Sequence, residues 1–277
     1  MRNYTLNCRG YKLPLGTQSH LMGILNITPD SFSDGGMYNS LEKSIEHGQN
    51  MVRDGASIID IGGESTRPGF QPITEDEEIQ RIAPVIEVLL KELNVPLSLD
   101  TYKSKVAQFA LEQGVQIIND IWGLQRDLEM ASIIAHFQAP VIVMHNQDHT
   151  HYEQDIITEM KTFLAQSIEL ALKAGIKDEN IILDPGIGFG KTFAQNLEVL
   201  ARLREFNDLG YPLLLGTSRK GFIGKILDLP PQERVEGTIA TTVLGISHGF
   251  DIFRVHDVKE NYRALIVTDK IVRKRED

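Results

Sequence analysis

Short apolar segments recur along the chain and alternate with longer amphipathic ones. Eight of the apolar segments have the length and the Ile, Leu and Val content of strands: residues 21–28, 57–63, 96–101, 115–120, 140–145, 180–186, 211–218 and 251–256. Because these segments are continuously apolar rather than alternating, each predicts a strand that is buried on both faces, as in a parallel sheet.

The segments between these strands predict helices, because their apolar positions recur three and four residues apart. The clearest of them are residues 41–55, 77–93, 105–114 and 155–175. Several helices should end at a glycine just before the next strand, in the left-handed conformation that glycine adopts without strain. These glycines are Gly55, Gly114, Gly175, Gly210 and Gly249.

The second helix carries two further signals. Thr74 and Glu77 have the spacing of a capping box and predict its start. Pro84 lies inside the same helix and predicts either a kink or a later start, because proline cannot donate the intrahelical hydrogen bond.

The alternation of strand and helix favours a closed (β/α)8 TIM barrel, an α/β fold, over an open doubly wound sheet. At 277 residues the chain is close to the length of about 250 residues that is typical of such a barrel. No linker or shift in composition divides it, so we expect a single domain over residues 1–277. Residues 1–20 precede the first strand and predict a short N-terminal hairpin.

Composition and charge exclude several classes of function. The chain has 28 Lys and Arg against 38 Asp and Glu, and a net charge of -10 opposes an extended grip on nucleic acid or on an anionic membrane. No apolar run is long enough for a signal peptide or a membrane span, so we expect a cytoplasmic protein. Cys8 is the only cysteine, which excludes an internal disulfide, and we expect no reactivity from it.

Polar residues close every predicted strand, and the C-terminal strand ends of a barrel are where its catalytic groups gather. In chain order these residues are Asn26, Glu64 to Arg67, Asp100, Asn119 with Asp120, His145, Asp184, Ser218 to Lys220, and Arg254 with His256. Two loops after the first and second strands, residues 28–40 and 65–76, are long and rich in Gly, Pro, Ser and Asp. Loops of this length in a compact domain favour a function, and we interpret them as lids.

The segment DPGIGFGK at residues 184–191 resembles two phosphate-binding patterns without fitting either. The phosphate-binding P-loop requires glycine where the chain has Pro185, and the dinucleotide pattern requires glycine where it has Lys191. What remains is a strand-end carboxylate, Asp184, followed by glycines and by Phe189, which could cover a planar ring.

The loop after the fifth strand is rich in histidine. A transition-metal site is one interpretation of His145, His149 and His151 with Asp148 and Glu153. A hydrophilic surface loop explains the same residues and is favoured, because the spacing fits no regular pattern of ligands.

Seven segments, taken in order, resemble dihydropteroate synthases: MGILNITPDSFSDGG, DIGGESTRPG, SLDT, IIND, ILDPGIGFGK, GTSRKGFIG and FRVHDV. The resemblance covers residues 21 to about 260. It departs from the family's usual pattern in VMHNQDHTHYE, after the fifth strand.

The resemblance implies that 6-hydroxymethyl-7,8-dihydropterin diphosphate condenses with 4-aminobenzoate to give 7,8-dihydropteroate and diphosphate, in folate biosynthesis. Pterin contacts are implied for Asp100, Asn119, Met144, Asp184, Phe189, Gly216 and Lys220. Diphosphate contacts are implied for Asn26, Thr66, Arg254 and His256, with Mg2+ held by Asn26. Aminobenzoate contacts are implied for Phe32, Thr66, Arg67, Pro68, Phe189, Ser218 and Lys220, with the carboxylate at the start of a helix beginning at Ser218.

Of these residues, Asp100, Lys220, Arg254 and His256 would be catalytic. The resemblance also implies a homodimer and an aminobenzoate pocket for which sulfonamides compete. Two alternatives stay open. A pterin-dependent corrinoid methyltransferase would share the barrel but bind no diphosphate, against which the retained SRK, RVH and STRPG segments argue. A non-catalytic pterin-binding relative would be expected to lack Asp100, Lys220 or the first lid, and the chain keeps all three.

Overall fold

Eight parallel strands form the centre of the molecule. The computed structural model describes residues 4–27, 36–64 and 72–273. The strands are β3 (His20–Asn26), β4 (Ile58–Gly62), β5 (Leu97–Asp100), β6 (Ile117–Asp120), β7 (Val141–Met144), β8 (Ile181–Asp184), β9 (Leu214–Leu215) and β10 (Ile252–Val255). Their order in the sheet is β8-β7-β6-β5-β4-β3-β10-β9, and a parallel bridge between Leu183 and Leu213 joins the two outermost strands. The predicted barrel is therefore confirmed, and the open-sheet alternative is not.

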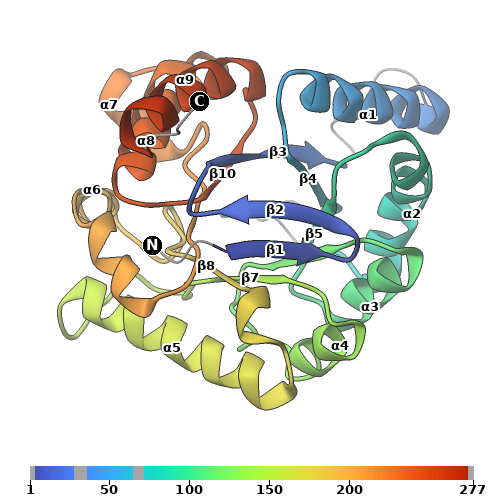
Figure 1. Ribbon diagram of the computed structural model, residues 1–277, viewed down its shortest axis with the longest axis horizontal. Coiled ribbons are helices and arrows are strands. Elements are labelled where there is room, and N and C mark those ends of the chain that lie inside the picture. Colours follow the sequence, from blue (N-terminus) through green and yellow to red (C-terminus); the bar gives the residue numbers. More distant parts are fainter. Residues whose placement is uncertain (1–3, 28–35, 65–71, 274–277) are drawn as a thin grey trace.

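Helices surround the sheet as a ring (Figure 1). They are α1 (Gly36–Arg53), α2 (Glu75–Glu92), α3 (Ser104–Gln113), α4 (Met130–Phe137), α5 (Ile156–Ala174), α6 (Phe193–Ala201), α7 (Gly221–Leu227), α8 (Val235–Ser247) and α9 (Val258–Val272). The described residues also form three short 3-10 helices: η2 (Asp178–Asn180), η3 (Leu203–Leu209) and η4 (Pro231–Glu233). The apolar faces of the long helices pack on the outside of the barrel and form the larger of two hydrophobic clusters.

Local signals in the sequence fix several of the helix ends. The capping box is present, with the Glu77 N–H donating to Thr74 Oγ1 and the Thr74 N–H donating to Glu77 Oε2. This box caps α2 at Thr74, so the helix starts well before Pro84 and continues through it. The alternative of a later start at Pro84 is therefore wrong. All the predicted capping glycines are left-handed, with φ between +78° and +109°: Gly55, Gly114, Gly175, Gly210 and Gly249. The first lid was predicted too long, since α1 already begins at Gly36.

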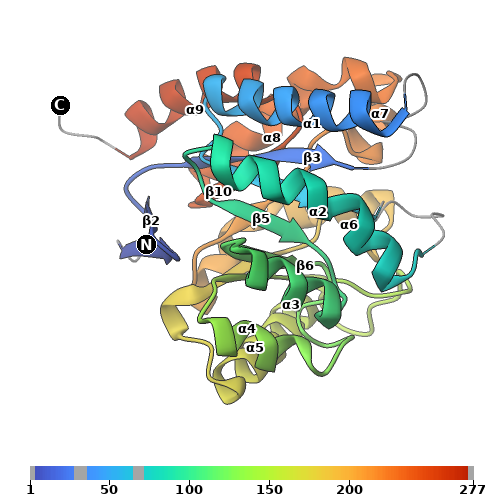
Figure 2. The same cartoon turned by 90° about the vertical axis from the view of Figure 1, so that its right-hand side faces the viewer.

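The predicted N-terminal hairpin is present and closes the amino-terminal end of the barrel. Its strands β1 (Tyr4–Cys8) and β2 (Tyr11–Leu15) pair antiparallel. Their apolar side chains pack on the first residues of the barrel strands in a second hydrophobic cluster. In Figure 2 the hairpin lies at the left, whereas the arrows of β3 and β5 point to the right, toward the carboxyl ends of the strands. The hairpin and the strand ends that carry the predicted chemistry therefore lie at opposite ends of the barrel.

The only cysteine, Cys8, is buried. Burial raises the pKa of Cys8 to about 12, so the group is a thiol and not a nucleophilic thiolate at neutral pH.

Among the described residues, no helix combines the length and the apolar character that crossing a membrane would require.

Candidate active site

A cavity of about 550 Å³ opens at the carboxyl ends of the strands. It brings together every predicted site residue that the structure describes: Asn26, Asp100, Asn119, Met144, Asp184, Phe189, Gly216, Ser218, Lys220, Arg254 and His256. The other predicted residues, Phe32, Thr66, Arg67 and Pro68, lie outside the described residues. Residues from seven strands or the loops that follow them thus converge on one space, as the closed barrel requires.

Arg254 joins two carboxylates inside the barrel. Its Nε donates to Asp60 Oδ2 over 2.6 Å, and its Nη2 donates to Asp100 Oδ2 over 2.7 Å. Asn119 Nδ2 donates to the same Asp60 oxygen over 3.2 Å. Burial alone would lower the pKa of Arg254, but the neighbouring carboxylates outweigh it and raise the pKa. The guanidinium is therefore held as a fixed positive charge at the floor of the cavity.

The carboxylates of Asp60 and Asp100 each use one oxygen in the contact with Arg254, and the other oxygen is not part of it. Asp60 Oδ1 and Asp100 Oδ1 are buried and have no hydrogen-bond partner within the described part of the chain. Burial raises the pKa of Asp100 to about 7, although the Arg254 guanidinium opposes the shift. Since Asp100 also lines the cavity, its second oxygen can accept a hydrogen bond from a bound molecule or face a developing positive charge there.

Asp184 stands on the other side of the cavity. Its Oδ1 accepts the Gly186 N–H over 2.7 Å. A Cβ at Gly216 would lie 3.8 Å from Asp184 Oδ2, so a larger residue there would reduce the space in front of this oxygen. Burial raises the pKa of Asp184, while the positive charge of Lys220 opposes the shift. Asp184 and Gly216 thus form a recess with a carboxylate at one side.

Lys220 and Phe189 form a wall of the same recess. The Lys220 Nζ donates to the carbonyl of Ile187 and lies 4.7 Å from the centroid of the Phe189 ring. Burial lowers the pKa of Lys220 to about 8, against the opposing effect of Asp184. An ammonium above an aromatic face gives a surface on which a planar ring can lie.

Ser218 and His256 contact each other at the rim. Ser218 Oγ lies 2.9 Å from His256 Nδ1 and accepts the His256 N–H over 3.0 Å. The predicted helix start at Ser218 is wrong, because α7 begins at Gly221. The Ser218 hydroxyl is occupied by the end of β10 instead of capping a helix.

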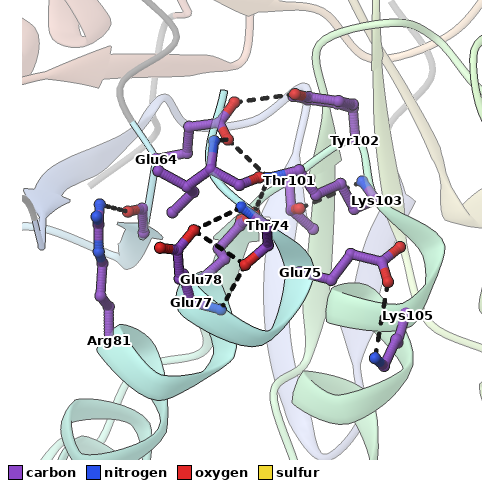
Figure 3. Close-up of polar contacts among 12 residues, drawn as sticks. Glu64, Thr74, Glu75, Glu77, Glu78, Arg81, Thr101, Tyr102, Lys103 and Lys105 are labelled. Atoms are coloured by element: carbon purple, nitrogen blue, oxygen red, sulfur yellow. Dashed lines mark hydrogen bonds and ion pairs between the residues drawn. The ribbon is translucent and has the colours of Figure 1, made fainter. Parts of the chain in front are cut away.

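A buried cluster of ionic groups lies beside the site, where β4 ends (Figure 3). Lys103 Nζ donates to Glu64 Oε2 over 2.6 Å, to Glu78 Oε2 over 2.7 Å and to the Ile73 carbonyl over 2.8 Å. Glu64 Oε2 also accepts the Ile73 N–H over 2.9 Å. Glu64 directly precedes the residues predicted as the second lid, 65–76, and Ile73 belongs to the described part of that lid, so the cluster holds the two together next to β5.

Comparison with known proteins identifies the family. The family model described as "Pterin binding enzyme" matches residues 22–256. A dihydropteroate synthase of Bacillus subtilis (strain 168) is 55% identical over 92% of this chain and 89% of that protein. One of Clostridium beijerinckii is 52% identical over 94% of this chain and 97% of that protein. The chain belongs to the dihydropteroate synthases, within the pterin binding enzyme family.

Solved structures of dihydropteroate synthases share the fold. The enzyme from Clostridium difficile, solved in the presence of pteroic acid, superposes with a TM-score of 0.92 at 57% identity, covering 94% of this chain and 98% of that one. The enzyme from Xanthomonas albilineans, solved with 4-aminobenzoic acid, gives a TM-score of 0.92 at 38% identity and covers 98% of both chains. The resemblance noted from the seven sequence segments is confirmed.

The Mg2+ that the dihydropteroate synthase resemblance implies can be tested against the residues present. Asn26 ends β3 at the cavity, and the neighbouring Gly62 leaves room beside it, since a Cβ at Gly62 would lie 3.4 Å from Asn26 Oδ1. Mg2+ commonly combines one or two protein oxygens with waters and substrate phosphates. A single amide oxygen at the cavity would therefore fit this ion together with a phosphorylated substrate.

The candidate ligands of the histidine-rich loop do not lie around one point in the structure. His145 is buried, whereas His149 and His151 are exposed, and Asp148 lies 3.8 Å from Arg126. In the ranges that the structure describes, no three His, Cys, Asp or Glu side chains gather as a metal-binding group.

Several residues in or next to the cavity were not predicted from the sequence. Asp60 lies in the middle of β4, and its signal was a carboxylate inside an otherwise apolar strand, two residues before Gly62 and therefore on the same face. Lys191, Lys225 and Arg234 also line the cavity. Arg234 donates to the carbonyl of Arg219 before α7 and to that of Leu229 after it, and so joins the two ends of this helix, a relationship for which the sequence contains no signal.

Proposed function

We propose that the chain condenses 6-hydroxymethyl-7,8-dihydropterin diphosphate with 4-aminobenzoate and releases 7,8-dihydropteroate and diphosphate, as a transferase of folate biosynthesis. Relatives at 52% and 55% identity are dihydropteroate synthases, which supports the reaction. The observation that carries the proposal is that Asp184 and Lys220 line the same cavity as Asp100 and Arg254. Asp184 and Lys220 suit the binding of a polar planar ring. Asp100 and Arg254 suit the breaking of a bond that leaves an anion.

Asp184, Asn119 and Lys220 bind the pterin in this proposal. The ring edge offers adjacent N–H donors to the Asp184 carboxylate, Asn119 supplies both a donor and an acceptor, and Lys220 donates to the acceptor atoms of the ring. Met144, Phe189 and Gly216 shape the slot. The recess that Gly216 leaves in front of Asp184 supports this arrangement.

The diphosphate lies at Arg254, His256, Thr66 and Asn26. Two nitrogens of the Arg254 guanidinium, Nε and Nη2, donate to carboxylates, so we assign Nη1 to the leaving group. Negative charge grows on the diphosphate as the carbon–oxygen bond breaks, and these fixed donors stabilise it. Mg2+ bound at Asn26 would neutralise part of that charge.

Asp100 faces the pterin methylene, where positive charge grows during the same step. Its buried Oδ1, which has no partner within the described part of the chain, supports an electrostatic role. The arylamine is neutral at pH 7 and attacks directly, so the reaction needs no serine or cysteine nucleophile. We count Asp100, Lys220, Arg254 and His256 as the catalytic residues.

The aminobenzoate lies between the wall of the cavity and the two lids. Phe189, Lys220 and Ser218 contact it from the cavity, and Phe32, Thr66, Arg67 and Pro68 are the lid residues. Because α7 begins at Gly221, no helix starts at Ser218 to receive the aminobenzoate carboxylate. We assign the carboxylate to the side chains of these cavity and lid residues instead. A Yersinia pestis relative at 41% identity was solved as a sulfonamide drug complex, which supports the same pocket as a sulfonamide target here.

The chain acts as a cytoplasmic, single-domain homodimer in this proposal. Its partners are the two small-molecule substrates, with no nucleic acid or membrane. Apolar side chains on the outer face of α9, among them Val267 at 60% and Ile271 at 71% exposed, support association through the outer helices. A lone, buried cysteine supports a reducing compartment.

Turnover of the two substrates by the purified chain with Mg2+ tests the function. Formation of 7,8-dihydropteroate, followed by mass spectrometry, is expected. A preparation that folds, binds neither substrate and forms no product above background would refute the proposal.

A further inference from the structure

Lys191 and His145 form a buried pair to which the proposed reaction assigns no role. The Lys191 ammonium is 2.9 Å from the Gly186 carbonyl, 2.9 Å from the Phe189 carbonyl and 3.0 Å from His145 Nδ1. Burial lowers the pKa of Lys191 to about 7, and in the protonated form its three N–H groups are all used by these three acceptors. Lys191 lines the cavity, yet its donors are directed into the protein rather than toward a ligand.

His145 is fixed as an acceptor for this lysine. Burial, together with the Lys191 charge, lowers the pKa of His145 to about 2, so the imidazole is neutral at any physiological pH. A protonated Lys191 can only donate, so in that form Nδ1 accepts and the ring proton lies on Nε2. The ring is held between Phe163, edge-on at 4.9 Å, and Tyr152, stacked at 6.2 Å.

The segment between Asp184 and Lys191 is fixed from its other sides as well. Lys220 Nζ reaches the Ile187 carbonyl, the Gly188 N–H donates to Asn196 Oδ1 over 2.6 Å, and the Tyr152 hydroxyl donates to the Gly190 carbonyl over 3.0 Å. Gly186 has a φ of +64°, and a Cβ there would lie 2.0 Å from the His145 carbonyl. The segment therefore lies directly against the end of β7, and glycine is required for that approach.

Phe189 is the residue that this arrangement places. Lys191 holds the carbonyl of Phe189 itself and that of Gly186, which in turn accepts the Phe189 N–H over 3.1 Å. The Phe189 ring lies 4.7 Å from Lys220 Nζ, and both residues belong to the pterin and the aminobenzoate sites proposed above. A shift of the Phe189 backbone would therefore move the wall that both substrates use.

We propose that Lys191, with His145 as its fixed acceptor, is a positioning residue that sets the Phe189 ring against Lys220 in the substrate slot. The inference rests on the proposed function, since the slot matters only if planar substrates occupy it. It accounts for lysine at the position where the dinucleotide pattern would have glycine. A compact ammonium can meet three acceptors that surround one point, whereas the planar fork of arginine cannot.

Lys191→Met in the full chain tests the inference, because it keeps much of the side-chain length and removes the three donors. We expect the KM for the pterin diphosphate to rise about ten-fold, with a change in kcat of less than about three-fold. Lys173→Met, at an exposed position on α5, is the matched control and should leave both constants unchanged.

Phe189→Ala and the double variant Lys191→Met with Phe189→Ala separate positioning from general stability. If Lys191 acts through Phe189, the double variant should have a KM within about two-fold of Phe189→Ala alone. A double variant whose KM shows the full product of the two single effects, or a Lys191→Met protein with the parent KM, would overturn the inference.

His145→Phe provides a second route should Lys191→Met not fold. It removes one of the three acceptors, so we expect a rise in KM of about three-fold with little change in kcat, and a parent-like KM would contradict the pair. Parent turnover distinguishes the two proposals. An inactive parent refutes the proposed function, whereas an active parent with unaffected variants refutes only the role of Lys191.

Discussion

Arg254 Nε donates to Asp60 Oδ2 over 2.6 Å in the interior of the barrel, where Asp60 is completely buried. A charge in this position is tolerated only because it is paired, and removing one partner leaves the other uncompensated in a medium of low polarity. The same contact directs the guanidinium toward Asp100 and the cavity. We therefore expect this ion pair to affect both the stability of the fold and the proposed reaction.

Asp60→Asn should destabilise the fold. The substitution keeps the shape of the side chain but leaves Arg254 with one carboxylate, and we expect a loss of about 3 kcal/mol in the free energy of unfolding, measured by urea denaturation. Asp76→Asn is the control, because Asp76 pairs with Lys105 at the surface and is 74% exposed, and we expect less than about 1 kcal/mol there. Equal effects of the two substitutions would contradict a structural role for the buried pair.

Arg254→Lys should weaken binding of the pterin diphosphate much more than binding of the free pterin. Lysine keeps a positive charge near Asp60 and Asp100 but has no fork with which to hold both carboxylates and still donate to the diphosphate. Calorimetric titration should show about 30-fold weaker binding of the pterin diphosphate, and a change of less than about three-fold for the free hydroxymethyl pterin. Equal losses for the two ligands would rule out the assignment of Arg254 to the leaving group.

The pH dependence of kcat/KM should be bell-shaped and narrow. Asp100, whose pKa is raised to about 7, must be ionised to stabilise positive charge, so activity falls as the pH drops below about 7. Lys220, whose pKa is lowered to about 8, must be protonated to donate, so activity falls as the pH rises above about 8. Steady-state rates across this range measure both limbs.

Two variants assign the limbs. Lys220→Arg replaces the lysine by a group that stays charged, so the alkaline limb should move to higher pH even where the rate is lower. Asp100→Asn should remove the acid limb together with most of the activity. An alkaline limb that is unmoved in Lys220→Arg would mean that another group titrates there.

The fold and most of the cavity could be predicted because both depend on repeated local patterns. Continuous apolar strands followed by polar residues determine a barrel with its chemistry at one end. Residues as distant in sequence as Asn26, Asp184 and His256 could therefore be assigned to one cavity without knowledge of their contacts. Helix ends followed from glycine caps and from the capping box at Thr74 for the same local reason.

What could not be predicted depends on partners far apart in the chain. Asp60 sits within an apolar strand, and its role appears only when Arg254, on another strand, reaches it. Ser218 has the residue type of a helix cap, but its hydroxyl contacts His256, directly after β10, and α7 begins later. Lys191 fits no phosphate-binding pattern, and its three acceptors include His145, which follows β7 and is 46 residues away in the sequence. No local rule contains these pairings.

Titration of the pterin diphosphate into the Asp184→Asn variant, with Mg2+ present, tests most directly whether the cavity is a pterin site. The amide would present a donor to the ring edge where the carboxylate accepts, and we expect heat of binding from the parent and none from the variant. Asp208→Asn, at a 70% exposed aspartate paired with Lys161, should bind like the parent. An Asp184→Asn protein that folds and binds the pterin diphosphate with the parent affinity would contradict the proposed site.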